Sequence, residues 1–135
     1  MITKPELFSA WLAKSQEIAD SLNLPLSYFG TDTATGSSFM PDADKPYLKA
    51  TVIYGEETAP YLNGLDGQRY TAILQIDAVY PKHLVFAAID TALSIKDAIP
   101  LDSKVGAIVR NVSTSPVMYE QERVIQSVSV VVKAF

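Results

Sequence analysis

The chain has 135 residues, a net charge of −4 at pH 7 and no cysteine. This length predicts one domain, residues 1–135, and a composition that is 48% hydrophobic is sufficient for a buried core. The absence of cysteine excludes disulfides and thiolate metal sites. The acidic balance and the scattered basic residues argue against a nucleic-acid binder. The sequence has neither a secretory leader nor an apolar run of about 18 residues. It therefore predicts synthesis in the cytoplasm and no association with a membrane.

A first helix is predicted from Pro5 to Leu22. Thr3 and Glu6 have the spacing of a capping box, and Pro5 suits a first helical turn. Asn23 and Pro25 end the helix, because proline cannot continue it. We expect Trp11→Ala to be the most damaging change here. The residues of the apolar stripe are Leu7, Phe8, Trp11, Ile18, Ala19 and Leu22.

The next part of the chain predicts strands separated by long loops. Leu26–Phe29 is a short strand, and Gly30–Pro46 is rich in turn-forming residues and therefore a loop. Tyr47–Tyr54 alternates as a strand does, and Gly55–Gly67 is a second long loop. The apolar face of Tyr47–Tyr54 consists of Leu48, Ala50, Val52 and Tyr54.

The segment Gln68–Tyr80 is predicted to be one long strand with a single core face. One register is entirely apolar or aromatic, comprising Tyr70, Ala72, Leu74, Ile76, Ala78 and Tyr80. The other register is mixed, comprising Thr71, Ile73, Gln75, Asp77 and Val79. We expect Ile73 and Val79 to lie against a neighbouring element or subunit rather than in solvent.

A second helix is predicted from Lys82 to Ala98, ended by Pro100. Its expected stripe is Val85, Phe86, Ile89, Ala92 and Leu93. Val105–Val112 and Val124–Phe135 are the last strands, joined by the polar segment Ser113–Glu122. The order α-β-β-β-α-β-β predicts an α+β fold, with a mainly antiparallel sheet and two helices packed on it.

Three of the connections are longer than the usual four to six residues or so, which suggests functional loops. Each carries a pair of apolar residues that would be costly to leave in water. Packing back on the core and contact with a partner both explain them. These residues are Phe39, Met40, Tyr61, Leu62, Met118 and Tyr119.

No residue pattern predicts catalysis, a metal or a cofactor. His83 is the single histidine, and no serine lies in a nucleophile elbow. Asp32, Asp42 and Asp44 lack the spacing of a calcium loop, and the glycine clusters match no phosphate-binding motif. The remaining acidic groups, Glu56, Glu57, Glu120 and Glu122, are expected on polar loops. The sequence therefore predicts a protein that is not an enzyme.

The order of these elements resembles the tail terminator-like proteins of long-tailed bacteriophages. The likeness lies in three segments: Pro46-Tyr47-Leu48 opening a strand, Tyr70–Pro81 leading into the second helix, and the closing strand Gln126–Val132. The chain departs from the pattern after Pro81, where relatives often have a glycine-containing turn. The resemblance covers nearly the whole chain.

This resemblance implies a structural virion protein at the head-proximal end of the tail. Such proteins form a ring, usually a hexamer, that stops tail-tube polymerisation and offers a docking surface for head completion. The implied partners are further copies of the chain, the tail tube protein and a head-completion or neck protein. DNA would pass through the lumen without specific binding, and lumen-facing acidic side chains would repel its phosphates.

The expected subunit and partner contacts combine the loop residues with the mixed register of the long strand. They are Phe39, Met40, Tyr61, Leu62, Ile73, Gln75, Asp77, Val79, Met118 and Tyr119. Charge changes at Gln75 or Asp77 are expected to disturb assembly more than folding. Another phage neck, head–tail connector or tail-completion protein also fits the sequence, and so does a small ligand- or calcium-binding module that uses the Asp-bearing loop.

Overall fold

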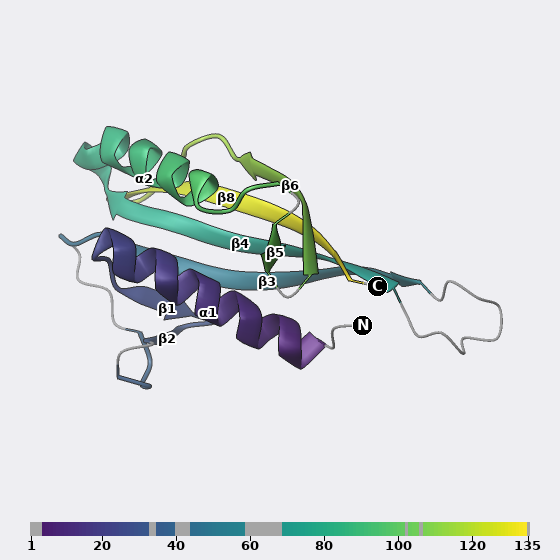
Figure 1. The fold of residues 1–135 in the computed structure, drawn as a ribbon. Helices are drawn as coiled ribbons and strands as arrows, with labels where there is room; N and C mark the ends of the chain where they lie inside the picture. The colour runs from purple at the N-terminus through teal and green to yellow at the C-terminus, as the bar shows by residue number, and fades with distance from the viewer. Residues whose placement is uncertain are drawn as a thin grey trace.

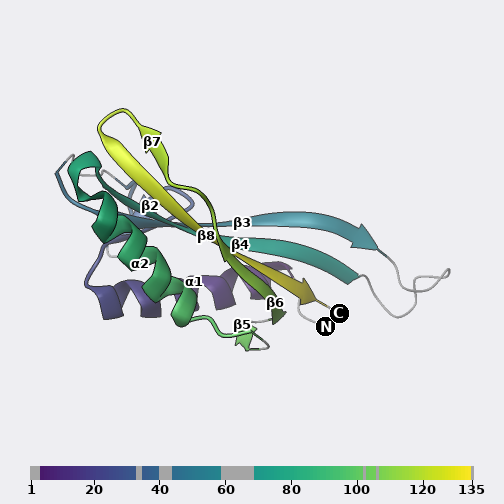
Figure 2. The same ribbon diagram turned by 90° about the horizontal axis from the view of Figure 1, so that it is seen from above.

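The computed structural model describes residues 4–32, 35–39, 44–58, 69–101, 103–105 and 107–134. It has the predicted α+β fold, in which a mostly antiparallel eight-stranded sheet carries both helices on one face (Figures 1 and 2). In chain order the elements are α1 (Lys4–Leu22), β1 (Leu26–Tyr28), β2 (Thr31–Asp32), β3 (Tyr47–Thr58), β4 (Arg69–Pro81), η1 (Lys82–Leu84), α2 (Val85–Asp97), β5 (Lys104–Val105), β6 (Ala107–Thr114), β7 (Met118–Glu120) and β8 (Arg123–Ala134).

The predicted helices and long strands are confirmed, and the structure adds the short strands β2, β5 and β7. All three long predicted loops were too long, and the polar segment Ser113–Glu122 contains both the end of β6 and β7. The loop predicted over Gly30–Pro46 contains β2, and β3 continues to Thr58 rather than ending at Tyr54. The second helix begins with the 3₁₀ turn η1, so its α-helical part starts at Val85.

The sheet is built around three long antiparallel strands, β3, β4 and β8, in the strand order β2-β1-β3-β4-β8-β6-β5. β4 pairs with β8 along its length, from Tyr70 opposite Ala134 to Pro81 opposite Arg123. β1 is parallel to β3, whereas the other pairs are antiparallel. The distal end of β3 and the start of β4 project together beyond both helices (Figures 1 and 2).

The core lies between the helices and the apolar register of β4. Ala72, Leu74, Ile76 and Ala78 in β4 are fully buried, as predicted. The α1 stripe is also confirmed, with Leu7, Trp11 and Ile18 buried. The Trp11 indole Nε1 donates a hydrogen bond to the Thr51 carbonyl at 3.1 Å, which anchors the middle of α1 to β3. A buried indole with a satisfied N–H contributes packing without an unpaired polar group.

The predicted buried stripe of α2 was wrong for Phe86 and Leu93. Both side chains are exposed, and Phe86 has 79% of its surface accessible. Ala92 is buried as predicted, and the other residues of α2 that face the sheet are Ala88, Thr91 and Ile95. The hydroxyl of buried Thr91 hydrogen-bonds with that of Tyr80 on β4, and this contact requires the observed rotation of the helix. The sequence of α2 contains two apolar stripes at helical spacing. The stripe with the small residues Ala88 and Ala92 faces the sheet, because small side chains allow the helix to pack closer to it.

Candidate functional site: the open face of the sheet

The helices leave one face of the sheet without a covering helix among the described residues, and we call it the open face (Figure 2). Side chains alternate across a strand, so the residues between the buried positions point to this face. On β4 these are the mixed-register residues Thr71, Ile73, Gln75, Asp77 and Val79. The strand register brings matching residues of β3 and β8 alongside them.

Residues that lie opposite one another on neighbouring strands form rows across the open face. Ile53, Ile73 and Val131 form an apolar row, the isoleucine row. At the other end, Tyr47, Val79, Ile125 and Met118 form a second apolar row, the aromatic row. Between them lie two polar rows, which consist of Thr51, Gln75, Ser129 and Ser113, and of Lys49, Asp77 and Ser127.

The isoleucine row is the least covered apolar part of the open face. Ile53 has 52% of its surface exposed and Ile73 has 36%. The two residues are directly opposite each other on β3 and β4, so they form one cross-strand contact. Val131 on β8 is half-buried and continues the row. A contiguous apolar row of this kind is typical of an interaction surface.

The polar rows hold a fixed hydrogen-bond network centred on Asp77. Its Oδ1 accepts a hydrogen bond from Gln75 Nε2 at 2.8 Å and another from Ser127 Oγ at 2.6 Å. Ser127 is buried, and Gln75 and Asp77 are half-buried. Hydrogen bonds to an ionised carboxylate are among the stronger ones in proteins, so this network holds the polar band in one arrangement.

The aromatic row is partly covered by the chain itself. The Phe39 ring packs against the Tyr47 ring with their centroids 4.8 Å apart. The Arg123 guanidinium lies over the same tyrosine ring at 5.3 Å from its centroid, within the range of a cation–π contact. Val79 is flanked by Tyr47 and Ile125 and is only 3% exposed, so it offers little surface to a partner.

The structure gathers most of the described candidate contact residues on the open face. Ile73, Gln75, Asp77, Val79 and Met118 share it through strand register, and Phe39 packs on it through Tyr47. Tyr119 pairs with Val124, which is opposite Tyr80, so its exposed side chain belongs to the helix side of the sheet. Met40, Tyr61 and Leu62 lie outside the described residues.

Sequence reasoning missed Ile53, the most exposed member of the isoleucine row. The signal was present in the alternation of Lys49, Thr51 and Ile53 along β3. Only the apolar register of that strand was interpreted, and its partner across the sheet could not be assigned without the observed pairing of Ile53 with Ile73. The pairing turns two separate isoleucines into one surface feature.

The described residues considered for chemistry lie on several different elements. His83 is exposed in η1 and lines a hollow of about 460 Å³ together with Asp44, Pro81, Lys82 and Glu122. Asp32 lies on β2, and Asp42 lies outside the described residues. Glu120 and Glu122 are exposed at the turn between β7 and β8. Glu56 and Glu57 lie in β3 rather than in a loop.

No group of three or more metal-binding side chains occurs within the described ranges. The helices described are also too short or too polar to span a membrane.

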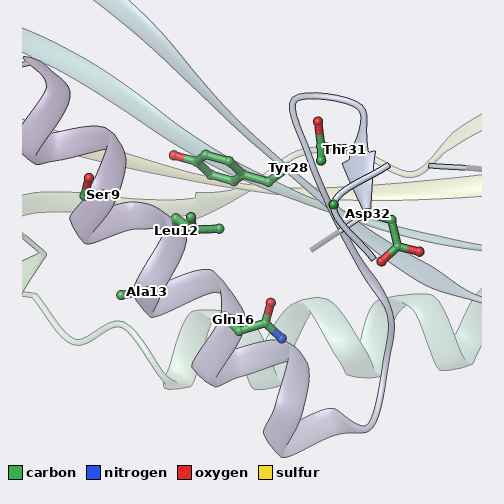
Figure 3. A pocket seen from close by; sticks show the side chains of 8 residues that line it. Ser9, Leu12, Ala13, Gln16, Tyr28, Thr31 and Asp32 are labelled. Carbon is green, nitrogen blue, oxygen red and sulfur yellow. The ribbon is translucent and has the colours of Figure 1, made fainter. Parts of the chain in front are cut away.

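A larger pocket of about 650 Å³ lies between α1 and the β1–β2 hairpin (Figure 3). The Tyr28 ring extends from β1 towards α1 (Figure 3), and the tyrosine hydroxyl donates a hydrogen bond to the Phe8 carbonyl at 2.7 Å. Asp32 is the one carboxylate among the described residues that line the pocket. The residues that line it are Ser9, Leu12, Ala13, Gln16, Tyr28, Thr31, Asp32 and Gly36.

Comparison with known proteins identifies the fold and no function. No protein-family model matches the sequence, and no curated protein matches it. Nine chains of solved structures match. One of them aligns over 98% of this chain and 97% of its own, with a TM-score of 0.67 and 19% sequence identity, and its name states no function. At this identity the likeness establishes that the α+β fold of the whole chain also occurs in an experimentally solved protein.

Proposed function

We propose that the chain is a structural subunit that assembles with copies of itself into a ring of the tail terminator type. Its role would be to cap the head-proximal end of a phage tail tube, stop tube polymerisation and offer a surface for head joining. The sequence resemblance to tail terminator-like proteins supplies the identity of the assembly. The open face supplies a surface for contacts between proteins.

The observation that carries the proposal is the exposed isoleucine row on a sheet face without a covering helix. Ile53 and Ile73 together present apolar surface whose burial would stabilise a contact by about 25 cal/mol per Å². The adjacent Asp77 network adds fixed polar groups that can set the register of a partner. A surface with an apolar row beside a polar band is typical of a protein interface rather than of an active site.

Replacing Ile53 with lysine tests this role, because its exposed position tolerates a long polar side chain. We expect Ile53→Lys to fold normally and to lose the ring, as measured by multi-angle light scattering and negative-stain images with tail tubes. Phe86→Lys is the matched control, since Phe86 is an exposed apolar residue on the helix side. Its variant should retain both the ring and the capping of tubes.

Gln75→Lys is the second change expected to weaken assembly more than folding. Asp77→Lys is a less suitable test, because it removes the acceptor of two hydrogen bonds and therefore perturbs folding as well. A wild-type protein that stays monomeric and never caps tubes would contradict the proposal. Binding to the head vertex instead of to tail tubes would favour the alternative, a head–tail connector or other neck protein.

The acidic composition supports one detail of the proposal. A net charge of −4 suits a ring through which DNA passes, because acidic lumen side chains repel phosphates. Binding of short duplex DNA by the assembled ring, measured by fluorescence anisotropy at low salt, should be undetectable. Strong salt-dependent binding would indicate a basic lining and contradict this detail.

A further inference from the structure

The sheet has two strand edges that no described strand covers along their full length. β3 runs from Tyr47 to Thr58, but β1 pairs only with Leu48–Ala50. On the opposite side of the sheet, β5 pairs only with Ala107 and Ile108 at the start of β6. The Val109 N–H of β6 also donates to the Ser103 carbonyl at 2.9 Å. The outer edges of the distal half of β3 and of β6 beyond Val109 therefore have no strand partner among the described residues, whereas their inner edges pair with β4 and β8.

Backbone geometry shows which groups of β3 point outward. The Leu48 N–H donates to the Pro25 carbonyl at 3.0 Å, and the Ala50 carbonyl accepts from the Phe29 N–H at 3.3 Å. Alternate residues of a strand present their N–H and C=O groups to the same edge. The backbone groups of Val52 and Tyr54 therefore face outward along the same edge, where β1 no longer runs. Exposed edges of this kind are templates for the addition of another strand.

The two edges are compatible in direction. β3, β4, β8 and β6 are successive antiparallel neighbours, so β3 and β6 run in opposite directions within one sheet. A copy placed beside the first, with its strands along the same axis, would bring its β6 antiparallel to the β3 edge. Such a contact joins two different patches and is therefore heterologous, the type that forms a ring when the rotation between successive copies closes.

Charge supports the same arrangement. The distal half of β3 contains Glu56 and Glu57, and the start of β6 lies among Lys104, Arg110 and Lys133, which are exposed. Antiparallel pairing of the two edges would bring the end of β3 towards the start of β6. The sequences of the two segments carry opposite charge, which favours this orientation over the association of either edge with itself.

We propose that copies of this chain join head to tail, with the distal half of β3 in one copy pairing antiparallel with β6 of the next. The inference rests on the proposed ring and specifies its subunit contact. Ile53, at the edge strand, would then complete the isoleucine row against the open face of the neighbouring copy. The result would be a sheet that continues from subunit to subunit around the ring.

Disulfide trapping can test this contact directly, because the natural chain contains no cysteine. Asn111 and Ser113 of β6 are exposed on the same sheet face as Ile53, so one of them should lie opposite Ile53 of the next copy. Within one chain, β3 and β6 are separated by three strand spacings, about 14 Å, which exceeds the disulfide limit of about 7 Å. Any disulfide between them must therefore join two chains.

The variants Ile53→Cys with Asn111→Cys, and Ile53→Cys with Ser113→Cys, are oxidised mildly and separated on non-reducing gels. We expect at least one of them to give a ladder of covalent multimers that ends at the size of the ring. Each single-cysteine variant should stay monomeric on the gel. The matched control, Ile53→Cys with Lys96→Cys on the exposed side of α2, should give no ladder.

The possible results distinguish a failure of this edge contact from a failure of the proposed ring. Rings that form by light scattering but give no ladder with either pair would overturn the edge contact and leave the ring intact. Efficient dimers from Ile53→Cys alone would show that β3 pairs with its own copy, which also overturns the head-to-tail contact. A protein that is monomeric at every concentration would overturn both the ring and its edge contact.

Discussion

The two faces of β4 place very different demands on side chains that are adjacent in sequence. Towards the helices, Ala72, Leu74, Ile76 and Ala78 are fully buried and form one continuous apolar surface. Towards the open face, apolar Ile73 is followed by Gln75 and Asp77 and then by buried Val79. The helix side is uniformly apolar because α1 and α2 cover it. The open face instead has two apolar rows at its ends and two polar rows between them.

The two faces of β4 therefore have different expected roles, with the helix side contributing to folding stability and the open face to assembly. The helix side supplies the apolar burial that folds the domain. The open face retains exposed apolar and hydrogen-bonding groups that folding alone does not require. Substitutions on the helix side should therefore change the free energy of unfolding, and substitutions in the isoleucine row should change the association of subunits. The three stability measurements below test that separation.

The largest loss of stability is expected for Trp11→Ala on the helix side. The change empties a large buried site and removes the hydrogen bond from the indole to the Thr51 carbonyl. Such a truncation should lower the free energy of unfolding by about 3–5 kcal/mol, as measured by urea denaturation. Trp11→Phe is the control and should lose less, because it keeps most of the ring volume. Equal stability of Trp11→Ala and wild type would mean that α1 does not hold the core together.

The pair Leu74→Ala and Ile73→Ala compares the two faces at neighbouring positions. Leu74 is fully buried against the helices, so its truncation should cost about 2–5 kcal/mol. Ile73 is partly exposed, and its truncation should cost less than about 1 kcal/mol in the monomer. Chemical denaturation at low protein concentration measures both. Similar losses at the two positions would show that the open face is covered in the folded monomer.

A smaller effect is expected at Asp77, in the polar band. Asp77→Ala would leave the Gln75 amide and the Ser127 hydroxyl without their shared acceptor, at a cost of about 1–2 kcal/mol. Asp77→Asn keeps an oxygen acceptor in place and should recover part of that loss. Thermal unfolding of the two variants measures the difference. A fully stable alanine variant would show that the network contributes nothing to folding and serves recognition alone.

Much of the fold could be predicted because its signals are local. The stripe of α1 and the apolar register of β4 repeat with the periods of a helix and a strand, and the structure confirms both. The short strands β2, β5 and β7 could not be predicted in the same way. Two or three residues are too few to show the alternation of a strand. Such short strands form only because the edge of a neighbouring strand offers them hydrogen-bond partners.

The candidate site could be predicted in part, from the mixed register of β4. Ile73, Gln75 and Asp77 were identified because their register mixes polar and apolar residues, whereas the other register of the strand is entirely apolar or aromatic. Ile53 and the Asp77–Ser127 hydrogen bond could not be identified, since they join strands far apart in the chain. Met118 and Tyr119 are adjacent in sequence, yet pairing with β8 sends them to opposite faces of the sheet.

The sequence by itself determined the two helices and the long strands, because periodicity and helix- or strand-ending residues act over a few positions. Only the tertiary structure decided how those elements are turned and aligned. The rotation of α2 places Thr91 against Tyr80 and leaves Phe86 in solvent. The rows of the open face depend on the register of β3 and β8 against β4. Both follow from contacts between distant segments, and these are set by packing rather than by local pattern.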